Sequence, residues 1–198
     1  MKRYIYGAGG HGKVVLDAMY QAGLICDGFI DDKSISQWAG LPVFSSAMLT
    51  QETDIRIHLA IGDCAVRQRI SACLIGVQPL SVKHPAAVVS LSAAVGHGSF
   101  LAAGAIVGPY ATVGEHSIIN HRAVVDHDCV VGDFCHIAPH VSLGGGVKIG
   151  HGVLVGAGAV ILPGLSVGDA AIIGAGSVVT KNVESGVIVA GNPARIIS

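Results

Sequence analysis

Aliphatic residues occupy every sixth position of the chain from Val89 to Val179, without a break in register. Each of these positions holds Val, Ile or Leu. A short fixed period of this kind is typical of a β-helix, in which stacked coils bury the repeating side chain inside a narrow prism. Six residues form one flat face and three faces form a coil of about eighteen residues, so the pattern predicts about five coils.

The residues around the aliphatic position fit the same geometry. Glycine often follows it, from Gly96 to Gly174. The residue two positions before it is small over the first half of the repeat, which leaves room near the corners of the prism. These small residues are Ala93, Ser99, Ala105, Ala111, Ser117, Ala123, Cys129 and Cys135.

The first eighty residues have another pattern, in which strand-like and helix-like segments alternate. We expect strands over 2–6, up to 29–30, over 55–61 and over 80–82, and helices over 14–22, over 46–52 and after Asp63. Residues 33–44 are expected to form a loop that contains Trp38 and Pro42. This β-α-β-α-β-α-β order predicts a parallel sheet, and thus a Rossmann-like α/β domain over 1–82 ahead of an all-β domain over 83–198.

A glycine-rich turn follows the first strand and precedes the first helix. It has the spacing Gly7-x-Gly9-x-x-Gly12, and Asp31 lies about twenty residues further on, as in dinucleotide-binding folds. Backbone N–H groups at such a helix start can hold phosphate, although a tight turn that only needs glycine has the same sequence. The domain has room for one mononucleotide, which favours the diphosphate of a nucleotide-sugar over NAD.

The ligand of a parallel sheet lies at the carboxyl ends of its strands. The residues expected there, and predicted to bind the substrate, are Gly9, Gly10, His11, Gly12, Asp31, Asp32 and Gly62.

The composition of the chain limits the classes of binding partner that we expect. The formal charge is −1 and no Lys/Arg run occurs, so nucleic acid and anionic membranes are poor candidates. Neither a signal peptide nor an apolar stretch long enough to span a bilayer is evident. The five cysteines have no CxxC spacing, which favours free thiols in a reducing cytoplasm.

His127 is the histidine with the best-placed neighbours. Residues eighteen apart stack in a β-helix, so Gly145 is expected above His127 and Pro109 below it. Asp126 and Asp128 flank it, and a histidine near carboxylates is a candidate general base. Adjacent strand residues point opposite ways, so Asp128 can contact His127 only where the backbone turns.

The other histidines of the repeat are expected to lie on surface turns. His116 and His121 have a spacing that suits a metal, but a zinc site needs a third converging ligand and the sequence offers none. We therefore expect no metal site. The surface histidines are His97, His116, His121, His140 and His151.

The segment 125–136, VDHDCVVGDFCH, resembles the active-site segment of the nucleotide-4-amino-sugar N-acetyltransferases, nearest to the UDP-N-acetylbacillosamine N-acetyltransferases, in the hexapeptide-repeat acyltransferase superfamily. The related sialic acid O-acetyltransferases share the architecture. The resemblance extends over the chain, through the motifs at 9–12, 31–32, 60–62, 84–85 and 191–195. It implies a left-handed parallel β-helix, acetyl-CoA as co-substrate, and a homotrimer with active sites between neighbouring β-helices.

The resemblance also assigns roles. It implies that His127 is the base, that Asp128 polarises it, and that the Gly145 backbone N–H meets the thioester carbonyl. Some members have Glu in place of Asp128. The remaining implied positions are His136 near the thioester, Asn120 at the sugar, and Ala157 and Ala175 along the pantetheine arm.

The implied reaction is direct acetyl transfer, since no cysteine matches a nucleophile position. Three other functions stay open: O-acetylation of a sugar acid, a γ-type carbonic anhydrase, and a nucleotide-sugar-binding module without activity. The carbonic anhydrase would leave residues 1–80 unexplained.

Overall fold

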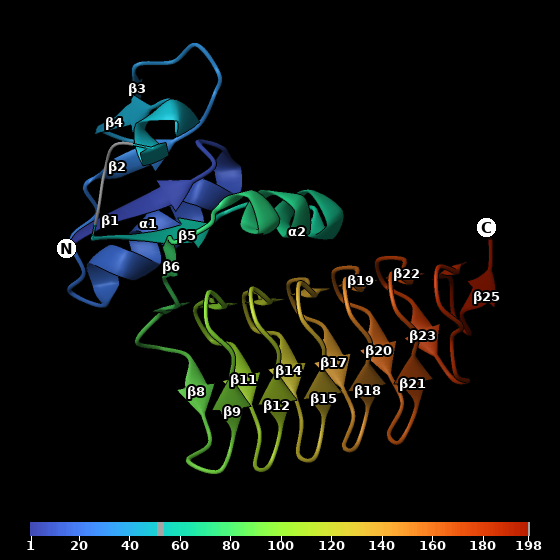
Figure 1. The fold of residues 1–198 in the computed structure, drawn as a ribbon. Coiled ribbons are helices and arrows are strands. Elements are labelled where there is room, and N and C mark those ends of the chain that lie inside the picture. The colour runs from blue at the N-terminus through green and yellow to red at the C-terminus, as the bar shows by residue number, and fades with distance from the viewer. Residues whose placement is uncertain (51–53, 198) are drawn as a thin grey trace.

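The computed structural model describes residues 1–50 and 54–197, and it consists of an N-terminal α/β domain set on a β-solenoid (Figure 1). The N-terminal elements are β1 (Lys2–Tyr6), α1 (Gly10–Gln21), β2 (Gly28–Ile30), β3 (Gln37–Trp38), β4 (Leu41–Phe44), η1 (Ser46–Thr50), β5 (Ile55–Leu59), α2 (Cys64–Cys73) and β6 (Gln78–Pro79). The sheet order is β3-β4-β2-β1-β5-β6. All neighbours are parallel except β3 and β4, which confirms the expected parallel sheet.

Helix α2 begins as the sequence predicts. The Asp63 side chain accepts a hydrogen bond from Val66 N at 2.8 Å, and so satisfies a donor that the first turn leaves open. Helix α1 has no such cap, because Gly9 occupies the N-cap position. Its first backbone N–H groups are therefore not occupied by a capping side chain.

Three N-terminal predictions need correction. Residues 33–44 are not a loop throughout: Trp38 pairs with Leu41 in the β3–β4 hairpin, and β4 extends the parallel sheet beside β2. The strand expected at 80–82 is wrong, since β6 closes the sheet earlier and Val82 pairs with Phe100 in the solenoid. The helix expected at 46–52 is the 3-10 helix η1, and residues 51–52 lie outside the described residues.

The solenoid has three parallel faces. Face 1 contains β7 (Val82–Lys83), β10 (Phe100–Leu101), β13 (Ile118–Ile119), β16 (His136–Ile137), β19 (Leu154–Val155), β22 (Ile172–Ile173), β24 (Ile188–Ala190) and the antiparallel β25 (Arg195–Ile196). Face 2 contains β8 (Val88–Val89), β11 (Ile106–Val107), β14 (Val124–Val125), β17 (Ser142–Leu143), β20 (Val160–Ile161) and β23 (Val178–Val179). Face 3 contains β9 (Ala94–Val95), β12 (Thr112–Val113), β15 (Val130–Val131), β18 (Lys148–Ile149) and β21 (Ser166–Val167).

The eighteen-residue coil is confirmed by the register. Val107 pairs with Val125, and Val125 pairs with Leu143. The estimate of about five coils is too low, because faces 1 and 2 hold eight and six strands. The last coil breaks the period: Ile173 pairs with Val189, so a count of perfect hexads misses it.

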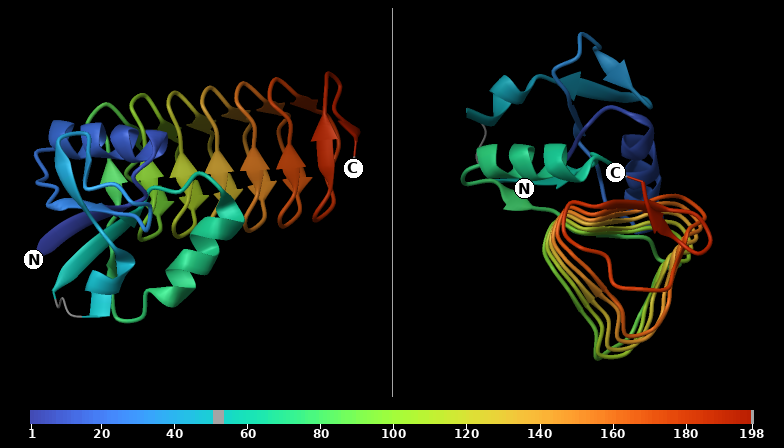
Figure 2. Two further views of the ribbon diagram at one scale, coloured as in Figure 1. Left: turned by 90° about the horizontal axis from the view of Figure 1, so that it is seen from above. Right: turned by 90° about the vertical axis from the view of Figure 1, so that its right-hand side faces the viewer.

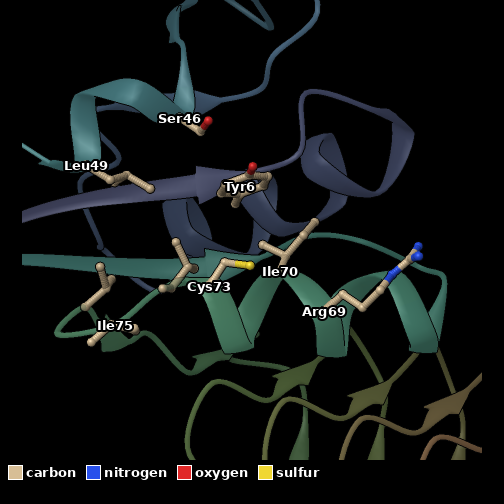
Figure 3. A pocket seen from close by; sticks show the side chains of 9 residues that line it. Tyr6, Ser46, Leu49, Arg69, Ile70, Cys73 and Ile75 are labelled. Carbon is tan, nitrogen blue, oxygen red and sulfur yellow. The ribbon is translucent and has the colours of Figure 1, made fainter.

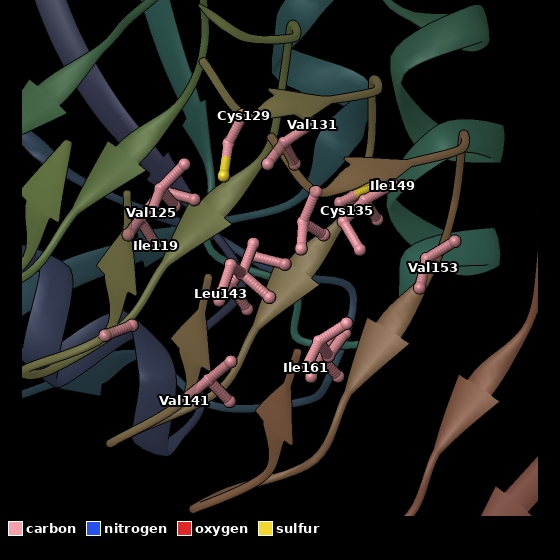
Figure 4. Close-up of a cluster of buried hydrophobic side chains, with 14 of the residues drawn as sticks. Ile119, Val125, Cys129, Val131, Cys135, Val141, Leu143, Ile149, Val153 and Ile161 are labelled. Atoms are coloured by element: carbon pink, nitrogen blue, oxygen red, sulfur yellow. The ribbon is translucent and has the colours of Figure 1, made fainter. Parts of the chain in front are cut away.

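The prism interior is a stack of aliphatic layers (Figure 4). Val125, Leu143 and Ile161 are fully buried, and the small residues two positions before Val125 and Ile161, which are Ala123 and Ala159, are buried as well. Burying one such aliphatic side chain stabilises a fold by about 1.5–3 kcal/mol. The repeat therefore supplies the energy that holds the coils in register.

Many corners of the prism contain a residue in the left-handed backbone region. This conformation turns the chain from one face to the next, and non-glycine residues adopt it at a cost. The non-glycine residues concerned in the solenoid are Tyr110, His116, Arg122, Asp128, Phe134, His140 and Ala170.

The N-terminal domain covers the outer surface of face 1 at its first coils. Phe100 and Ile118 point outward from face 1 and are fully buried in one apolar cluster with Val15 and Met19 of α1. Seen along the solenoid, the prism is triangular and the domain lies over one side of it (Figure 2). The corner between faces 2 and 3 is therefore the one most distant from the N-terminal domain. Among residues 1–50 and 54–197, no helix has the length and apolar character needed to cross a membrane.

Candidate active site

The glycine-rich turn is held in place by Asp31. Gly7 has a φ of 112° and donates to Ile30 O at 2.8 Å, and Ala8 N donates to Asp31 Oδ2 at 2.8 Å. A side chain at Gly12 would overlap Gly7 O, whereas one at Gly10 would meet nothing within 4 Å. The turn thus leaves open space beside the start of α1, where backbone N–H groups favour an anion.

Trp38 closes one side of this turn, a contact that sequence reasoning missed. Its indole Nε1 donates to Gly9 O at 3.3 Å, and the Lys13 ammonium lies 4.3 Å from its ring centre. The β3–β4 hairpin therefore carries the only tryptophan of the chain onto the glycine-rich turn. A lone tryptophan in a predicted loop was the available signal.

Asp32 lies beside the turn but is engaged with the protein. Its carboxylate accepts from Ser46 N at 2.8 Å, from Ser46 Oγ at 2.9 Å and from Ser45 Oγ at 3.0 Å. The bond from the Ser46 backbone is the main reason why the pKa of Asp32 is lowered.

A cavity of about 500 Å³ opens next to Ser46, between η1 and α2 (Figure 3). Tyr6, the last residue of β1, lines it with Arg69, Ile70 and Cys73. Burial, followed by the charge of Asp32, raises the pKa of Tyr6. The cavity thus lies at the carboxyl end of β1, where the ligand of a parallel sheet is expected.

His136 links the N-terminal domain to face 1. Its Nδ1 lies 3.1 Å from Gly62 O, and its Nε2 lies 3.1 Å from Asn120 Nδ2. Asn120 Oδ1 accepts from His121 N at 2.8 Å, so the amide nitrogen faces His136. His136 therefore donates from Nδ1 and accepts at Nε2, and burial lowers its pKa.

His11 lies in the same interdomain layer. Its ring packs edge-on against Phe100 at 5.4 Å and lies 6.3 Å from the His136 ring. Burial lowers the pKa of His11 to about 3. The predicted substrate residues His11, Gly62 and Asn120 are thus brought together with His136.

His127 stands at the corner between faces 2 and 3. Its Nδ1 lies 2.7 Å from Asp128 Oδ2, and Asp128 has a φ of 58°. The backbone turn that the contact requires is therefore present. The bond to Asp128, and next the charge of Asp126, raises the pKa of His127.

Gly145 is the neighbour that the imidazole faces. A side chain built on Gly145 would overlap His127 Nε2, and Gly146 N donates to His127 O at 2.9 Å. Pro109 O on the other side accepts from Asp128 N at 3.0 Å. The predicted column is confirmed. Within the described chain, the Gly145 N–H makes no hydrogen bond to the protein.

One chain does not bring all predicted residues together. Ala157 and Ala175 are exposed in one column at the corner between faces 1 and 2, and Gly176 N donates to Ala157 O at 2.8 Å. His136 lies on face 1 beside that corner. His127 and Gly145 lie at the corner between faces 2 and 3, across the prism from face 1.

Arg67 of α2 is a further buried residue, and no sequence pattern singled it out. It is 1% exposed and donates to backbone carbonyls of both domains.

Possible metal ligands do not cluster. No group of three or more His, Cys, Asp or Glu side chains suits a metal ion in the part of the chain that the structure describes.

Two family models match the chain. Residues 2–74 match the PglD N-terminal domain, and residues 110–145 and 146–181 match the bacterial transferase hexapeptide repeat. No curated protein matches in a sequence search.

Solved structures match over the full length. PerB from Caulobacter crescentus, solved with CoA and GDP-perosamine, is 35% identical with a TM-score of 0.95, covering 100% of this chain and 98% of that chain. The acetyltransferase domain of PglB from Neisseria gonorrhoeae with acetyl coenzyme A is 34% identical with a TM-score of 0.95, covering 99% and 98%. WeeI from Acinetobacter baumannii is 33% identical with a TM-score of 0.81, covering both chains fully.

The chain belongs to the nucleotide-sugar N-acetyltransferase family of the hexapeptide-repeat acyltransferases. The predicted family membership is thereby confirmed. The glycine-rich turn lies within the residues that match the PglD N-terminal domain, and His127 and Gly145 lie within the residues that match the hexapeptide repeat.

Proposed function

We propose that the protein transfers the acetyl group of acetyl-CoA to the amino group of a nucleotide-linked 4-amino sugar. The observation that carries this proposal is the His127–Asp128 pair, whose imidazole packs directly against Gly145. Structural similarity also supports the proposal, since the chain aligns from end to end with an N-acetyltransferase solved with CoA and GDP-perosamine. The proposal includes a left-handed winding of the solenoid and a Rossmann-like, nucleotide-binding N-terminal domain over 1–82.

His127 acts as the general base. The amine nitrogen of the sugar attacks the thioester carbon, and His127 takes the proton that the nitrogen loses. The C–N bond forms, the C–S bond breaks, and CoA leaves as the thiol after gaining a proton. Asp128 holds Nδ1–H, so that Nε2 presents its lone pair, and such base catalysis contributes roughly 10²–10⁴-fold to the rate.

Gly145 stabilises the oxyanion. Negative charge develops on the thioester oxygen as the amine attacks, and the backbone N–H beside His127 is the donor placed to receive it. A single donor of this kind contributes about 10²–10³-fold. Glycine is needed there, because any side chain would overlap the imidazole.

The N-terminal domain binds the nucleotide-sugar. The diphosphate of the nucleotide-sugar lies at the glycine-rich turn Gly9–Gly12, where Asp31 fixes the backbone and Trp38 covers one side. Asp32 and Gly62 stand at the neighbouring strand ends. Asn120 contacts the sugar and His136 the thioester, with pantetheine passing Ala157 and Ala175.

A homotrimer completes this site. His127 and the His136–Asn120 pair lie at different corners of one prism, so a single chain separates base from co-substrate. Face 2 joins these two corners, and its outer surface exposes Val88, Ile106 and Val160. Packing face 2 around a threefold axis would bring the His127 corner of one chain to the Ala157 corner of the next.

Thiol release from acetyl-CoA tests the function across a panel of nucleotide-linked 4-amino sugars and their 4-hydroxy counterparts. We expect release with at least one amino sugar, and a product whose acetyl group resists mild base as an amide does. Transfer only to hydroxyl groups would indicate the O-acetyltransferase instead, and no release with any amino sugar would contradict the proposal.

A further inference from the structure

Arg67 is an arginine buried without a carboxylate partner. Its side chain is 1% exposed, and no ion pair involves it within the described residues. A guanidinium taken out of water is costly unless its donors are satisfied, so the acceptors around it decide why it is retained.

Apart from Cys64 Sγ at 3.8 Å, those acceptors are backbone carbonyls from two parts of the molecule. Arg67 Nη1 donates to Ile61 O at 2.6 Å and to Gly62 O at 3.3 Å, in the segment between β5 and α2. On the solenoid side, Nε donates to His116 O at 2.8 Å and Nη2 donates to Phe134 O at 2.7 Å.

The two solenoid carbonyls belong to one corner. His116 and Phe134 are eighteen residues apart, both have left-handed φ values near 50–56°, and their rings stack 5.2 Å apart. Among the described residues, neither carbonyl accepts from another backbone N–H. The guanidinium of Arg67 therefore donates at once to carbonyl oxygens of two consecutive coils and of the N-terminal domain. The ammonium group of a lysine cannot do so with the same geometry.

The contact to Gly62 O connects Arg67 to His136 in the candidate active site. Gly62 O is also the acceptor for His136 Nδ1, and His136 Nε2 accepts from Asn120. We infer that Arg67 is a positioning residue for acetyl transfer: by fixing the Ile61–Gly62 carbonyls against the solenoid, it holds His136 as the Nδ1–H tautomer in one orientation.

Burial also favours the neutral state of this imidazole, because it lowers the pKa of His136. The bond to Gly62 O opposes this shift, and the charge of Arg67 adds to it. A neutral ring keeps Nε2 as an acceptor for Asn120. Displacing a positioned group by about 1 Å can cost about 10²-fold in rate, so loss of this support should be visible in kinetics.

The first test reads His136 directly. In ¹⁵N NMR of the wild-type protein, with His136 assigned by His136→Gln, we expect a protonated Nδ1 and a bare Nε2. In Arg67→Lys and Arg67→Met we expect a mixture of tautomers, whereas Gln68→Met, on the exposed side of α2, should retain the wild-type signal. A wild-type His136 protonated at Nε2, or an unchanged signal in a folded Arg67 variant, would overturn the inference.

The second test is a kinetic cycle, and it alone rests on the proposed function. Arg67→Met should raise the acetyl-CoA KM roughly tenfold or more, with a smaller change in kcat, and Arg67→Lys should recover part of the loss. In a His136→Ala background the same substitution should add little, because its target is already absent. An equal factor in both backgrounds would mean that Arg67 supports the fold only. If the wild type shows no acetyl transfer, the NMR result still decides the inference.

Discussion

At the residue scale, the chemistry depends on a two-residue detail. His127 and Asp128 are adjacent, yet their side chains meet because Asp128 adopts the left-handed conformation that turns the corner. The sequence predicted the Gly145 column, which follows from the period. It left the contact between His127 and Asp128 dependent on a turn of the backbone. The period alone did not predict the left-handed turn at Asp128, because glycine and non-glycine residues both occupy such corners.

The acid limb of the pH profile should report this pair. A general base works only when unprotonated, so kcat/KM should fall as pH drops through the pKa of His127, which the bond to Asp128 raises. Asp128→Asn removes the charge and lowers that pKa, and the limb should move to lower pH. Rates of wild type and Asp128→Asn measured from pH 5 to 9 check this. A limb that stays in place would show that another group titrates.

At the element scale, prediction succeeded where the repeat is strict and failed where it ends. One aliphatic side chain per face gave the strands of the prism, but the last coil is two residues short, and Val189 pairs out of period. The β3–β4 hairpin was missed because Pro42 suggested a loop, while Trp38 and Leu41 in fact pack toward the first helix. Tertiary packing overrode local preference there.

The glycine-rich turn offers a matched pair of substitutions. Gly10→Val should raise the KM for the amino sugar while leaving stability nearly unchanged, because a Cβ at this position has no protein atom within 4 Å and stands where phosphate is expected. Gly12→Ala should instead destabilise the domain, because its methyl group would overlap Gly7 O. Steady-state kinetics and thermal unfolding of both variants separate the effects. An effect of Gly10→Val confined to the acetyl-CoA KM would refute the assignment of the turn.

At the scale of the whole molecule, sequence reasoning reached its limit at the domain contact. The period relates residues within the solenoid only, so nothing in it placed Arg67 against two coils, or Gly62 O against His136. The structure also sets His127 across the prism from face 1, which makes assembly part of the proposed site.

Assembly can be tested on face 2. Ile106→Glu places a charge on its exposed outer surface and should convert the proposed trimer into folded monomers, with a loss of activity of at least tenfold, since buried unpaired charge opposes association. Thr112→Glu, exposed on face 3, is the control and should stay trimeric. Light scattering and circular dichroism give the outcome. Fully active monomers would remove the need for a shared site.

The most direct test of the central claim is the kcat of His127→Ala at saturating concentrations of both substrates. We predict a fall of roughly 10²-fold or more, the usual scale for loss of a general base, and a smaller fall for Asp128→Asn, which keeps the imidazole. Folding should be unaffected, because the His127 side chain is 59% exposed and its removal opens no cavity in the prism. A kcat near that of the wild type in a folded His127→Ala variant would contradict the account.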